Sequence, residues 1–358
     1  MPHQLTSPRT ADPDAPVVVR FAALGDVVLL TVLLQALAQR WGRPVHVLSS
    51  GPWTPVLLGQ DPSVSELRLV SSRRSPHWLT PSRWAADAWL RAHRGPVYHC
   101  ELDRWAERIV QRAGIAEHRM VRAWSHAPQG WCHWADWWLD IAGRDPAGIQ
   151  GPALAAAAPA RPRLHLSPAW RDDCDAWLRQ RGLQGRPLIL LQPGNKKTFK
   201  RGRIATAGHD KHWPATHWGA VVRGLWASMP GSAVLVCGSE RESGLAREIL
   251  DTAGAPPAGH VAVNLAADQP ALSMLCALTE RAAGMVSVDT GPAHVAGAMD
   301  CPLVVMYASA GWGRWRPRAA TAEVRVLGPE APTEGARLEQ ITPDEVLAEW
   351  TALRKRFS

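Results

Sequence analysis

The sequence is constrained most by a regular alternation, beginning at Pro16, of short apolar runs with longer amphipathic ones. A short apolar run bounded by turn residues is typical of a buried strand, whereas an apolar period of about 3.6 residues is typical of a helix. Strands that alternate with helices predict a parallel sheet covered by helices on both faces. The expected strands are 16–21, 44–50, 65–71, 96–102, 187–194, 232–239, 284–290 and 302–308. The expected helices are 26–40, 82–93, 103–113, 214–228, 240–253, 269–281, 291–299 and 343–355.

A change in composition divides this pattern into two parts. Residues 143–168 hold five prolines and many alanines and glycines, which is typical of a linker or a loose crossover. We therefore expect a disordered tail over 1–15, one Rossmann-like domain over 16–165, a second over 166–340 and a last helix over 341–358. Two doubly wound domains that face each other place a ligand in the cleft between them, at the carboxyl ends of the strands.

The charge balance points to an anionic partner. In 358 residues, 40 Lys+Arg against 32 Asp+Glu give a net charge of +8. Such a charge suits nucleic acid, a phosphorylated ligand or an acidic membrane surface. Only five lysines are present, and four of them fall in one short stretch: Lys196, Lys197, Lys200 and Lys211.

The same composition argues against several other classes of protein. No apolar run approaches the roughly 20 residues that a membrane span needs, and the polar, proline-rich start is not a signal peptide. The six cysteines are scattered without a CxxC pair. This argues against a zinc ribbon or a disulfide scaffold and fits reduced thiols in the cytoplasm. No P-loop and no GxSxG elbow occurs, so neither a P-loop NTPase nor an α/β-hydrolase is expected.

The first strand-to-helix turn carries one glycine and one acidic residue. It runs from Arg20 to Asp26 and contains only Gly25, so the glycine-rich loop of a dinucleotide-binding fold is missing. Asp26 has two interpretations. It is either a helix N-cap that accepts backbone N–H bonds, or a carboxylate that is aimed into the cleft as a general base.

A strand-to-helix turn in the C-terminal half combines the features of an anion site. Asp289 and Thr290 can cap the following helix, and Gly291 allows close approach of the backbone. Free N–H groups and the positive end of the helix dipole favour a phosphate there. His294 lies about one turn further on, where it can reach the same anion. The alternative is a well-capped helix with an incidental histidine.

Two further stretches have two interpretations each. The basic segment 196–203 follows a proline–glycine turn and is either an anion site or a solvated loop. Trp131, Trp134 and Trp138 would share one helical face, which indicates either core packing or contact with an amphiphilic acceptor or membrane interface.

No set of histidine, cysteine and carboxylate residues has the spacing of a metal site, so no metal is expected.

In this order, the motifs resemble those of glycosyltransferase family 9, the ADP-heptose:lipopolysaccharide heptosyltransferases, over nearly the whole chain from Val17. The family's R-x-x-x-L-G-D opening is matched by 20–26, its PG-type loop by 191–194, its K-x-W-P segment by 211–214 and its D-T-G-x-x-H motif by 289–294. The resemblance implies the GT-B fold, in which two Rossmann-like domains face each other across a cleft. It also implies an inverting transfer without a metal or other cofactor, with a nucleotide-diphosphate heptose such as ADP-heptose as the co-substrate.

The resemblance further implies roles for individual residues. Asp26 would be the base that deprotonates the acceptor hydroxyl. Lys211 would contact the donor's phosphates, and Glu240, on a looser match, would contact its ribose. The full set of implied donor-binding residues is Lys211, Glu240, Asp289, Thr290, Gly291 and His294.

The sequence departs from the family in two places, 307–316 and the long basic loop 195–210. We hypothesise that basic residues contact an anionic acceptor, such as phosphorylated lipid A–Kdo or core oligosaccharide. These residues are Arg73, Arg74, Lys196, Lys197 and Lys200. The expected protein is a cytoplasmic enzyme of lipopolysaccharide assembly, with room for a peripheral contact on the cytoplasmic face of the inner membrane.

Two other functions remain open from the sequence. A GT-B sugar-nucleotide epimerase would use the same donor and work without an acceptor. A basic nucleic-acid-binding protein would gather its positive charge into one continuous stripe with a recognisable binding module, and the sequence contains no such module.

Overall fold

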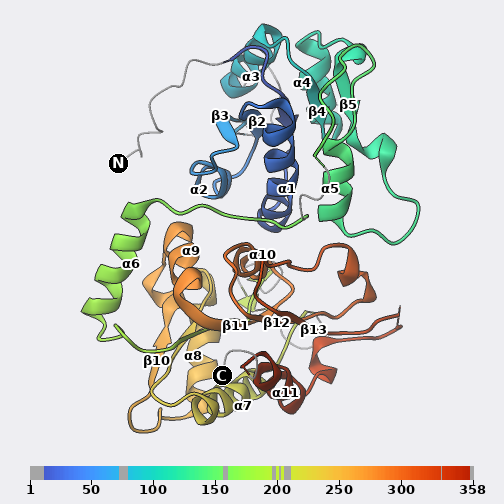
Figure 1. The fold of residues 1–358 in the computed structure, drawn as a ribbon. Coiled ribbons are helices and arrows are strands. Elements are labelled where there is room, and N and C mark those ends of the chain that lie inside the picture. The colour runs from blue at the N-terminus through green and yellow to red at the C-terminus, as the bar shows by residue number, and fades with distance from the viewer. Residues whose placement is uncertain are drawn as a thin grey trace. The chain divides into compact units, whose positions relative to one another are not determined.

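The computed structural model describes residues 12–71, 80–155, 160–195, 199–200, 203–204, 211–331 and 333–354. The chain divides into two compact units, Met1–His165 and Leu166–Ser358 (Figure 1). Each unit contains one large sheet whose strands are all parallel. The prediction of two Rossmann-like α/β domains is therefore confirmed.

The first unit is a five-stranded sheet in the order β3-β2-β1-β4-β5. Helices α1 and α5 pack against each other, as do α3 and α4, and these two pairs cover the sheet. The strands are β1 (Val17–Val19), β2 (Val45–Ser49), β3 (Val64–Leu69), β4 (Val97–His99) and β5 (Met120–Arg122). The helices are α1 (Leu24–Trp41), α2 (Thr54–Leu58), α3 (Pro81–Ala92), α4 (Arg104–Arg112) and α5 (Trp134–Ala142), with short 3-10 turns at Glu117–Arg119 and Ala123–His126.

Helix α1 forms much of the core of this unit. Leu29, Leu30, Leu33, Leu34 and Leu37 are almost fully buried, because the apolar residues of the helix recur around most of its circumference. Among the described residues, this is the one helix long and apolar enough to cross a membrane, with a mean hydropathy of 1.2, but 61% of it is buried inside the protein. The helix is thus accounted for by core packing.

The second unit has a six-stranded sheet in the order β10-β9-β6-β11-β12-β13 and a separate two-stranded β7-β8 hairpin. The strands are β6 (Leu188–Gln192), β7 (Phe199–Lys200), β8 (Arg203–Ile204), β9 (Ala233–Val236), β10 (Val261–Asn264), β11 (Ala282–Val288), β12 (Leu303–Met306) and β13 (Val324–Leu327). The helices are α6 (Pro168–Gln180), α7 (Ala215–Ser228), α8 (Ser243–Ala253), α9 (Leu272–Arg281), α10 (Gly291–Ala298) and α11 (Pro343–Arg354), with 3-10 turns at Glu240–Glu242, Leu265–Asp268, Ala310–Arg314 and Leu338–Gln340.

Eight strands and eight helices were expected, and each matches an observed element in position, α8 with the 3-10 turn before it. Several elements were not expected from the sequence: β5, β10, β13, the β7-β8 hairpin, α2 and α6, while α5 was anticipated only as the helical face of the tryptophans. The three missed strands of the large sheets lie at sheet edges or are only three or four residues long, so their side chains give too few repeats to show a period.

The interpretation of three tryptophans on one helical face was wrong for Trp131, whereas core packing is confirmed for Trp138. Helix α5 begins at Trp134, with His133 as its N-cap, whose ring nitrogen accepts the N–H of Ala135. Trp131 therefore precedes the helix, and 66% of it is exposed. Trp138 is buried and stacks on Trp137, with ring centroids 4.4 Å apart, which is core packing.

Candidate functional site

The first unit has its topological switch point between β1 and β4. From β1 the chain adds β2 and β3 on one side of the sheet, and from β4 it adds β5 on the other side. In open parallel sheets, ligands bind at the carboxyl ends of the strands flanking such a point. Arg20 follows β1 directly, and Cys100 and Glu101 follow β4. The sequence therefore places two charged side chains at the position where this fold binds ligands.

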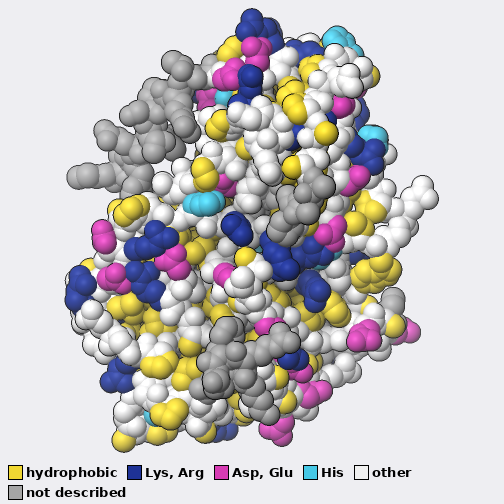
Figure 2. All heavy atoms as spheres, in the orientation of Figure 1, with side chains coloured by type: hydrophobic (Ala, Val, Ile, Leu, Met, Phe, Trp, Pro, Cys, Tyr) yellow, Lys and Arg dark blue, Asp and Glu magenta, His cyan; other side chains and the backbone are white. Residues whose placement is uncertain are grey.

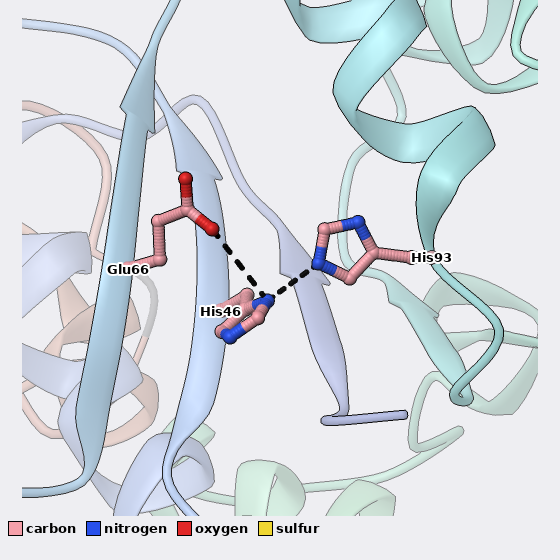
Figure 3. Close-up of side chains that lie close together, drawn as sticks. All are labelled: His46, Glu66 and His93. Carbon is pink, nitrogen blue, oxygen red and sulfur yellow. Dashed lines mark hydrogen bonds and ion pairs between the residues drawn. The ribbon is translucent and has the colours of Figure 1, made fainter. Parts of the chain in front are cut away.

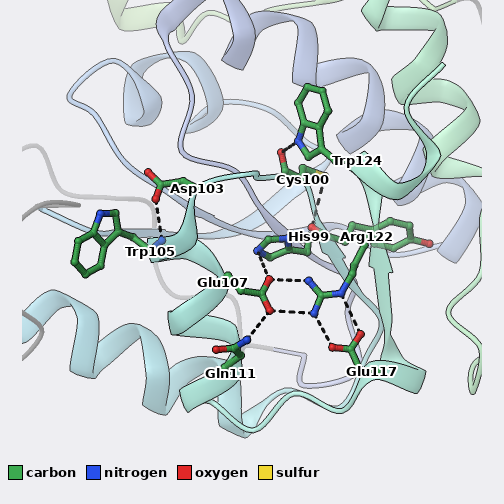
Figure 4. Close-up of polar contacts among 10 residues, drawn as sticks. His99, Cys100, Asp103, Trp105, Glu107, Gln111, Glu117, Arg122 and Trp124 are labelled. Carbon is green, nitrogen blue, oxygen red and sulfur yellow. Dashed lines mark hydrogen bonds and ion pairs between the residues drawn. The ribbon is translucent and has the colours of Figure 1, made fainter. Parts of the chain in front are cut away.

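Arg20 is held by a network that fixes its guanidinium group. One nitrogen, Nη1, donates to the carbonyl of Cys100 at 3.0 Å and lies 3.4 Å from Oε1 of Glu101. The guanidinium carbon lies 6.0 and 5.8 Å from the ring centres of Trp124 and Trp138. Trp124 itself donates to the same Cys100 carbonyl (Figure 4). Glu101 and Trp124 were not identified as functional from the sequence, although Glu101 lies at the end of a predicted strand.

Asp26 lies in the first turn of α1, with its Oδ2 3.9 Å from Nη2 of the fixed Arg20. The N-cap interpretation is wrong, because Ala23 occupies the N-cap position and no side chain caps this helix. About a third of the Asp26 side chain, 32%, remains exposed. Asp26 is thus a carboxylate beside an anchored arginine, accessible to a ligand and not engaged in capping.

The second unit has its switch point between β6 and β11. The PG turn at 193–194 follows β6, and Asp289 follows β11, so the sheet brings two motifs nearly 100 residues apart to one edge. Asp289 forms an ion pair with Lys211, which lies just before α7. The two side chains are 24% and 14% exposed, for Lys211 and Asp289 respectively. Two residues that sequence analysis assigned to the donor site are therefore in direct contact.

Helix α10 begins immediately after this ion pair. Thr290 is its N-cap by backbone conformation, with a φ of −158° and a ψ of 165°, but its side chain makes no capping hydrogen bond. Gly291 is the first helical residue and a proline follows it. The expectation that side chains cap this helix is thus not met, and the hydroxyl of Thr290 stays available at a helix N-terminus that favours anions.

His294 and Tyr307 lie behind this turn. His294 is 6% exposed, in the second turn of α10. Tyr307 follows β12 and is 1% exposed. Burial, with the nearby carboxylate of Asp289 as a second cause, raises the pKa of Tyr307 well above its usual value, so its hydroxyl stays protonated. Tyr307 was noted in sequence only as part of a departure from the family pattern, because one sequence does not show that β12 ends beside Asp289.

Glu240 and Glu242 differ sharply in environment. Glu240 opens the 3-10 turn after β9, and its side chain is exposed. Glu242 is 8% exposed, and its Oε2 accepts from the backbone and hydroxyl of Ser239 at 2.7 and 2.8 Å. Glu242 therefore closes a capping box. Of the two acids, Glu240 is the one free to meet a ligand, and Glu242 shapes the turn that presents it.

The basic residues assigned to an acceptor are placed only in part. Arg73, Arg74, Lys196 and Lys197 lie outside the described residues. Lys200 is described by its backbone alone, as the second residue of β7. The hairpin that contains it, β7-β8, pairs Phe199 with Ile204 and Lys200 with Arg203.

Trp213 ties the Lys211 segment to the core of the second unit. Its ring is 2% exposed, packs edge-on against Trp218 and donates to the carbonyl of Ile341 at 2.8 Å. Ile341 lies just before α11. The tryptophan of the K-x-W-P motif thus has a structural role, which is to fix the backbone that carries Lys211.

Five of the six cysteines are poor nucleophiles. Cys100, Cys174, Cys237, Cys276 and Cys301 are buried. Burial raises the pKa of the Cys174 thiol to about 11 and that of the other four thiols to about 12. These five side chains are therefore protonated and inert at neutral pH, so catalysis by a thiolate does not fit them.

The exposed large apolar side chains among the described residues all belong to the first unit: Leu69, Trp84, Leu102 and Trp131. Leu69 ends β3, Trp84 lies in the first turn of α3, Leu102 follows β4 and Trp131 precedes α5. Strand ends and the starts of the following helices share one edge of a parallel sheet. These four side chains, here called the apolar rim, therefore lie at the same sheet edge as Asp26.

The chain has two parallel α/β units. One carries an accessible carboxylate at its switch point, and the other carries a lysine and a helix N-terminus suited to a diphosphate. These features define a two-domain enzyme of the GT-B class. The model of glycosyltransferase family 9 (heptosyltransferase) matches residues 161–340, half of the chain. The chain belongs to this family and is a glycosyltransferase. The predicted family, fold class and enzyme class are thereby confirmed.

Solved structures share the fold over almost the entire chain. The structure of E. coli ADP-heptose LPS heptosyltransferase II has a TM-score of 0.70 at 22% identity and covers 96% of this chain and 99% of that one. A family 9 glycosyltransferase from Veillonella parvula DSM 2008 has a TM-score of 0.74 at 16% identity, with 96% and 98% covered. E. coli heptosyltransferase WaaC with ADP has a TM-score of 0.63 at 17% identity, with 95% and 99% covered. No curated protein sequence matches the chain.

Proposed function

We propose that the protein is an inverting glycosyltransferase that moves a heptose, or a related sugar, from an ADP-sugar to a lipopolysaccharide core or lipid A–Kdo acceptor. The observation that supports this most strongly is the ion pair between Lys211 and Asp289 at the N-terminus of α10. It joins two family motifs at the switch point of the second sheet. Similar folds occur in an E. coli ADP-heptose LPS heptosyltransferase and in a heptosyltransferase with ADP.

In the proposed reaction, the carboxylate of Asp26 removes the proton from the acceptor hydroxyl as the oxygen attacks the anomeric carbon. The bond between that carbon and the phosphate oxygen breaks, and ADP leaves with the electron pair. A single displacement of this kind inverts the anomeric centre. Support for the role of Asp26 comes from its exposed side chain, its lack of a capping role and the fixed Arg20 beside it.

The leaving diphosphate requires that its growing negative charge be stabilised. Lys211 supplies a mobile positive charge, and the first turn of α10 supplies backbone N–H groups and the positive end of a helix dipole. Donors that are already oriented before the reaction stabilise such charge without further reorganisation. We assign Thr290, Gly291 and His294 to the diphosphate, Asp289 to the hydroxyls of the sugar, and the exposed Glu240 to the ribose.

The donor is identified by the nucleotide sugar that stabilises the protein. We expect ADP-heptose to raise the melting temperature more than UDP- or GDP-sugars at equal concentration, because ligand that binds only the folded state adds RT ln(1 + [L]/Kd) of stability. A thermal-shift screen measures this. Equal shifts with all three nucleotides, or a larger shift with a UDP- or GDP-sugar, would overturn the assignment of ADP.

The same screen tests Glu240. Glu240→Gln is expected to reduce the shift caused by ADP without changing the melting temperature of the free protein, since Glu240 is exposed and outside the capping bonds. Glu242→Gln is the matched neighbour and is expected to lower the melting temperature of the free protein. An assay of ADP-heptose without acceptor distinguishes a transferase from an epimerase, because an epimerase would still convert the sugar nucleotide.

The acceptor is proposed to be anionic and amphiphilic, and to be contacted from the first unit by the apolar rim and by Arg73 and Arg74. Exposed tryptophan and leucine, together with basic residues, are suited to a peripheral contact with an acidic lipid surface. We include the basic loop with Lys196, Lys197 and Lys200 in this proposal. An enzyme that works on such an acceptor at the inner membrane would meet it from the cytoplasm.

Charge reversal tests the acceptor proposal. The triple variant Lys196→Glu/Lys197→Glu/Lys200→Glu is expected to raise the KM for acceptor about tenfold or more, because each lysine near an acidic lipid surface contributes about 1 kcal/mol. It should also reduce co-sedimentation with vesicles that contain acidic lipid. The control Arg179→Glu/Arg223→Glu/Arg247→Glu makes the same charge change at exposed positions elsewhere in the unit. Unchanged acceptor KM in the lysine variant would contradict the proposal.

The described side chains on the face shown in Figure 2 give no support to a nucleic-acid-binding function. On the face shown in Figure 2, the basic side chains of each unit are interspersed with acidic ones and form no continuous stripe. Several of the arginines are also paired with carboxylates, such as Arg122 with Glu107 and Glu117.

A further inference from the structure

A cluster of metal-ligand side chains lies in the first unit, apart from the residues assigned to transfer. His46 comes from β2, Glu66 from β3 and His93 from the C-cap of α3 (Figure 3). One ligand atom from each residue lies within 4.8 Å of the other two. The three are far apart in sequence, and no spacing rule pointed to them.

The cluster follows from the register of the sheet. His46 and Glu66 are direct partners in the parallel pair of β2 and β3, so their side chains project from the same face. Helix α3 covers that face and ends at His93. Nδ1 of His46 lies 2.5 Å from Nε2 of His93 and 3.9 Å from Oε2 of Glu66.

The hydrogen-bond pattern leaves two acceptor atoms, Nε2 of His93 and Oε2 of Glu66, close to Nδ1 of His46. Nδ1 of His93 lies 2.7 Å from the carbonyl oxygen of Trp89, which can only accept, so the His93 proton is on Nδ1 and Nε2 carries a lone pair. A proton on Nδ1 of His46 would satisfy that nitrogen. Oε2 of Glu66 would still be buried without a hydrogen-bond partner, and His46 itself is fully buried.

The surroundings of the cluster are those of a supported ligand set. The second oxygen of Glu66 accepts from Nε of Arg68 at 2.8 Å, and the bond of His93 to Trp89 fixes the orientation of its ring. Such outer contacts orient metal ligands in proteins. The cluster also lies at the C-terminal end of α3, where the helix dipole favours a cation.

We propose that His46 Nδ1, His93 Nε2 and Glu66 Oε2 bind one divalent transition-metal ion, with zinc as the ion that best suits two imidazoles and a carboxylate. Zinc bonds of about 2.0–2.1 Å in tetrahedral geometry hold two nitrogens about 3.3 Å apart. The two rings must therefore separate by less than about 1 Å from their present 2.5 Å contact. Water supplies the fourth ligand from the side of Glu66, whose side chain is 20% exposed.

The position of this site defines its role as structural. His46 pairs with Val17, the first residue of β1, so the ion would lie at the amino edge of the sheet. Asp26 lies at the opposite, carboxyl edge. The ion would link β2, β3 and the end of α3, and would take no part in glycosyl transfer. The prediction of a metal-independent reaction is therefore separate from this proposal.

The test uses the full chain without an affinity tag, stripped of metal by a chelator. We expect it to bind one equivalent of Zn²⁺ by elemental analysis, to melt at a higher temperature with Zn²⁺, and to give the visible absorption of tetrahedral cobalt with Co²⁺. Glu66→Gln and His93→Gln should each weaken zinc binding at least about tenfold. Glu66→Gln keeps the shape of a half-buried side chain, so it reports on binding even where His93→Gln folds poorly.

The matched control is His99→Gln in the same sheet. His99 is buried on β4, its Nε2 lies 3.8 Å from Oε2 of Glu107, and Arg122 holds that carboxylate, but among the described residues no further ligand completes a metal-binding group there (Figure 4). This variant should bind zinc as the unchanged protein does. The proposal fails if the unchanged protein binds no more zinc than Glu66→Gln, or if His99→Gln loses as much.

Discussion

Asp26→Asn is expected to lower kcat for sugar transfer by about 10³-fold, within the range of about 10² to 10⁴ that a positioned general base contributes. The amide has nearly the same shape as the carboxylate but cannot take the acceptor proton. The change should leave the Kd for the donor unaltered, because the donor residues belong to the other unit. Single-turnover kinetics and calorimetric titration of ADP-sugar measure the two effects separately.

The control for this variant is Asp145→Asn. Asp145 is also paired with an arginine, Arg40, and its side chain is 33% exposed, close to the 32% of Asp26. It lies near the C-terminal end of α1, far along the helix from Asp26. We expect near-normal kcat per folded molecule. Transfer at the normal rate by Asp26→Asn would exclude Asp26 as the base.

Lys211→Gln is expected to lower kcat/KM for the donor by about 10²- to 10³-fold, the loss typical when one donor to a developing negative charge is removed. The effect has two causes. The positive charge that meets the diphosphate is lost, and the carboxylate of Asp289, paired with Lys211 in the free protein, is left to repel it. Steady-state kinetics at varied donor concentration measures the change.

A double-mutant cycle separates those two causes. Lys211→Gln/Asp289→Asn should bind donor more tightly than Lys211→Gln alone, because the unpaired carboxylate is removed as well. Arg281→Gln is the control: it breaks an ion pair with Asp175 in the same unit, and the Arg281 side chain is 23% exposed, similar to Lys211. Its effect should be on stability and not on donor affinity. If the double variant is weaker than the single one, Asp289 has a direct role that outweighs repulsion.

Most of the fold was predictable because both sheets are parallel and buried. Strands of this kind are continuous apolar runs separated by helices, and that pattern is visible in one sequence. The short edge strands β5, β10 and β13 were not predictable, because three or four half-buried residues carry no clear period. Helix α6 was missed because the proline at its first turn was read as the end of a linker, although proline is well suited to that position.

The candidate site was predictable where a motif covers a single turn. Asp26 and the 289–294 turn each lie on one local segment, so their placement follows from strand–turn–helix order. The ion pair of Lys211 with Asp289 joins residues 78 positions apart, and it depends on β6 and β11 being neighbours. The His46–Glu66 pairing depends on strand register in the same way. Single sequences carry no signal for such pairings.

The hydrogen bond from Trp213 to Ile341 bears on where the donor-binding unit ends. The segment matched by the family model stops at residue 340, one residue short of the carbonyl that holds this indole. Helix α11, which follows, packs on α7 and completes the core around Val346 and Trp350. A fragment trimmed to the matched segment would thus lose the core contacts that support Lys211, the lysine proposed to contact the diphosphate. The smallest fragment that keeps Lys211 in place therefore has to include the final helix, even though no residue of that helix is assigned to the donor.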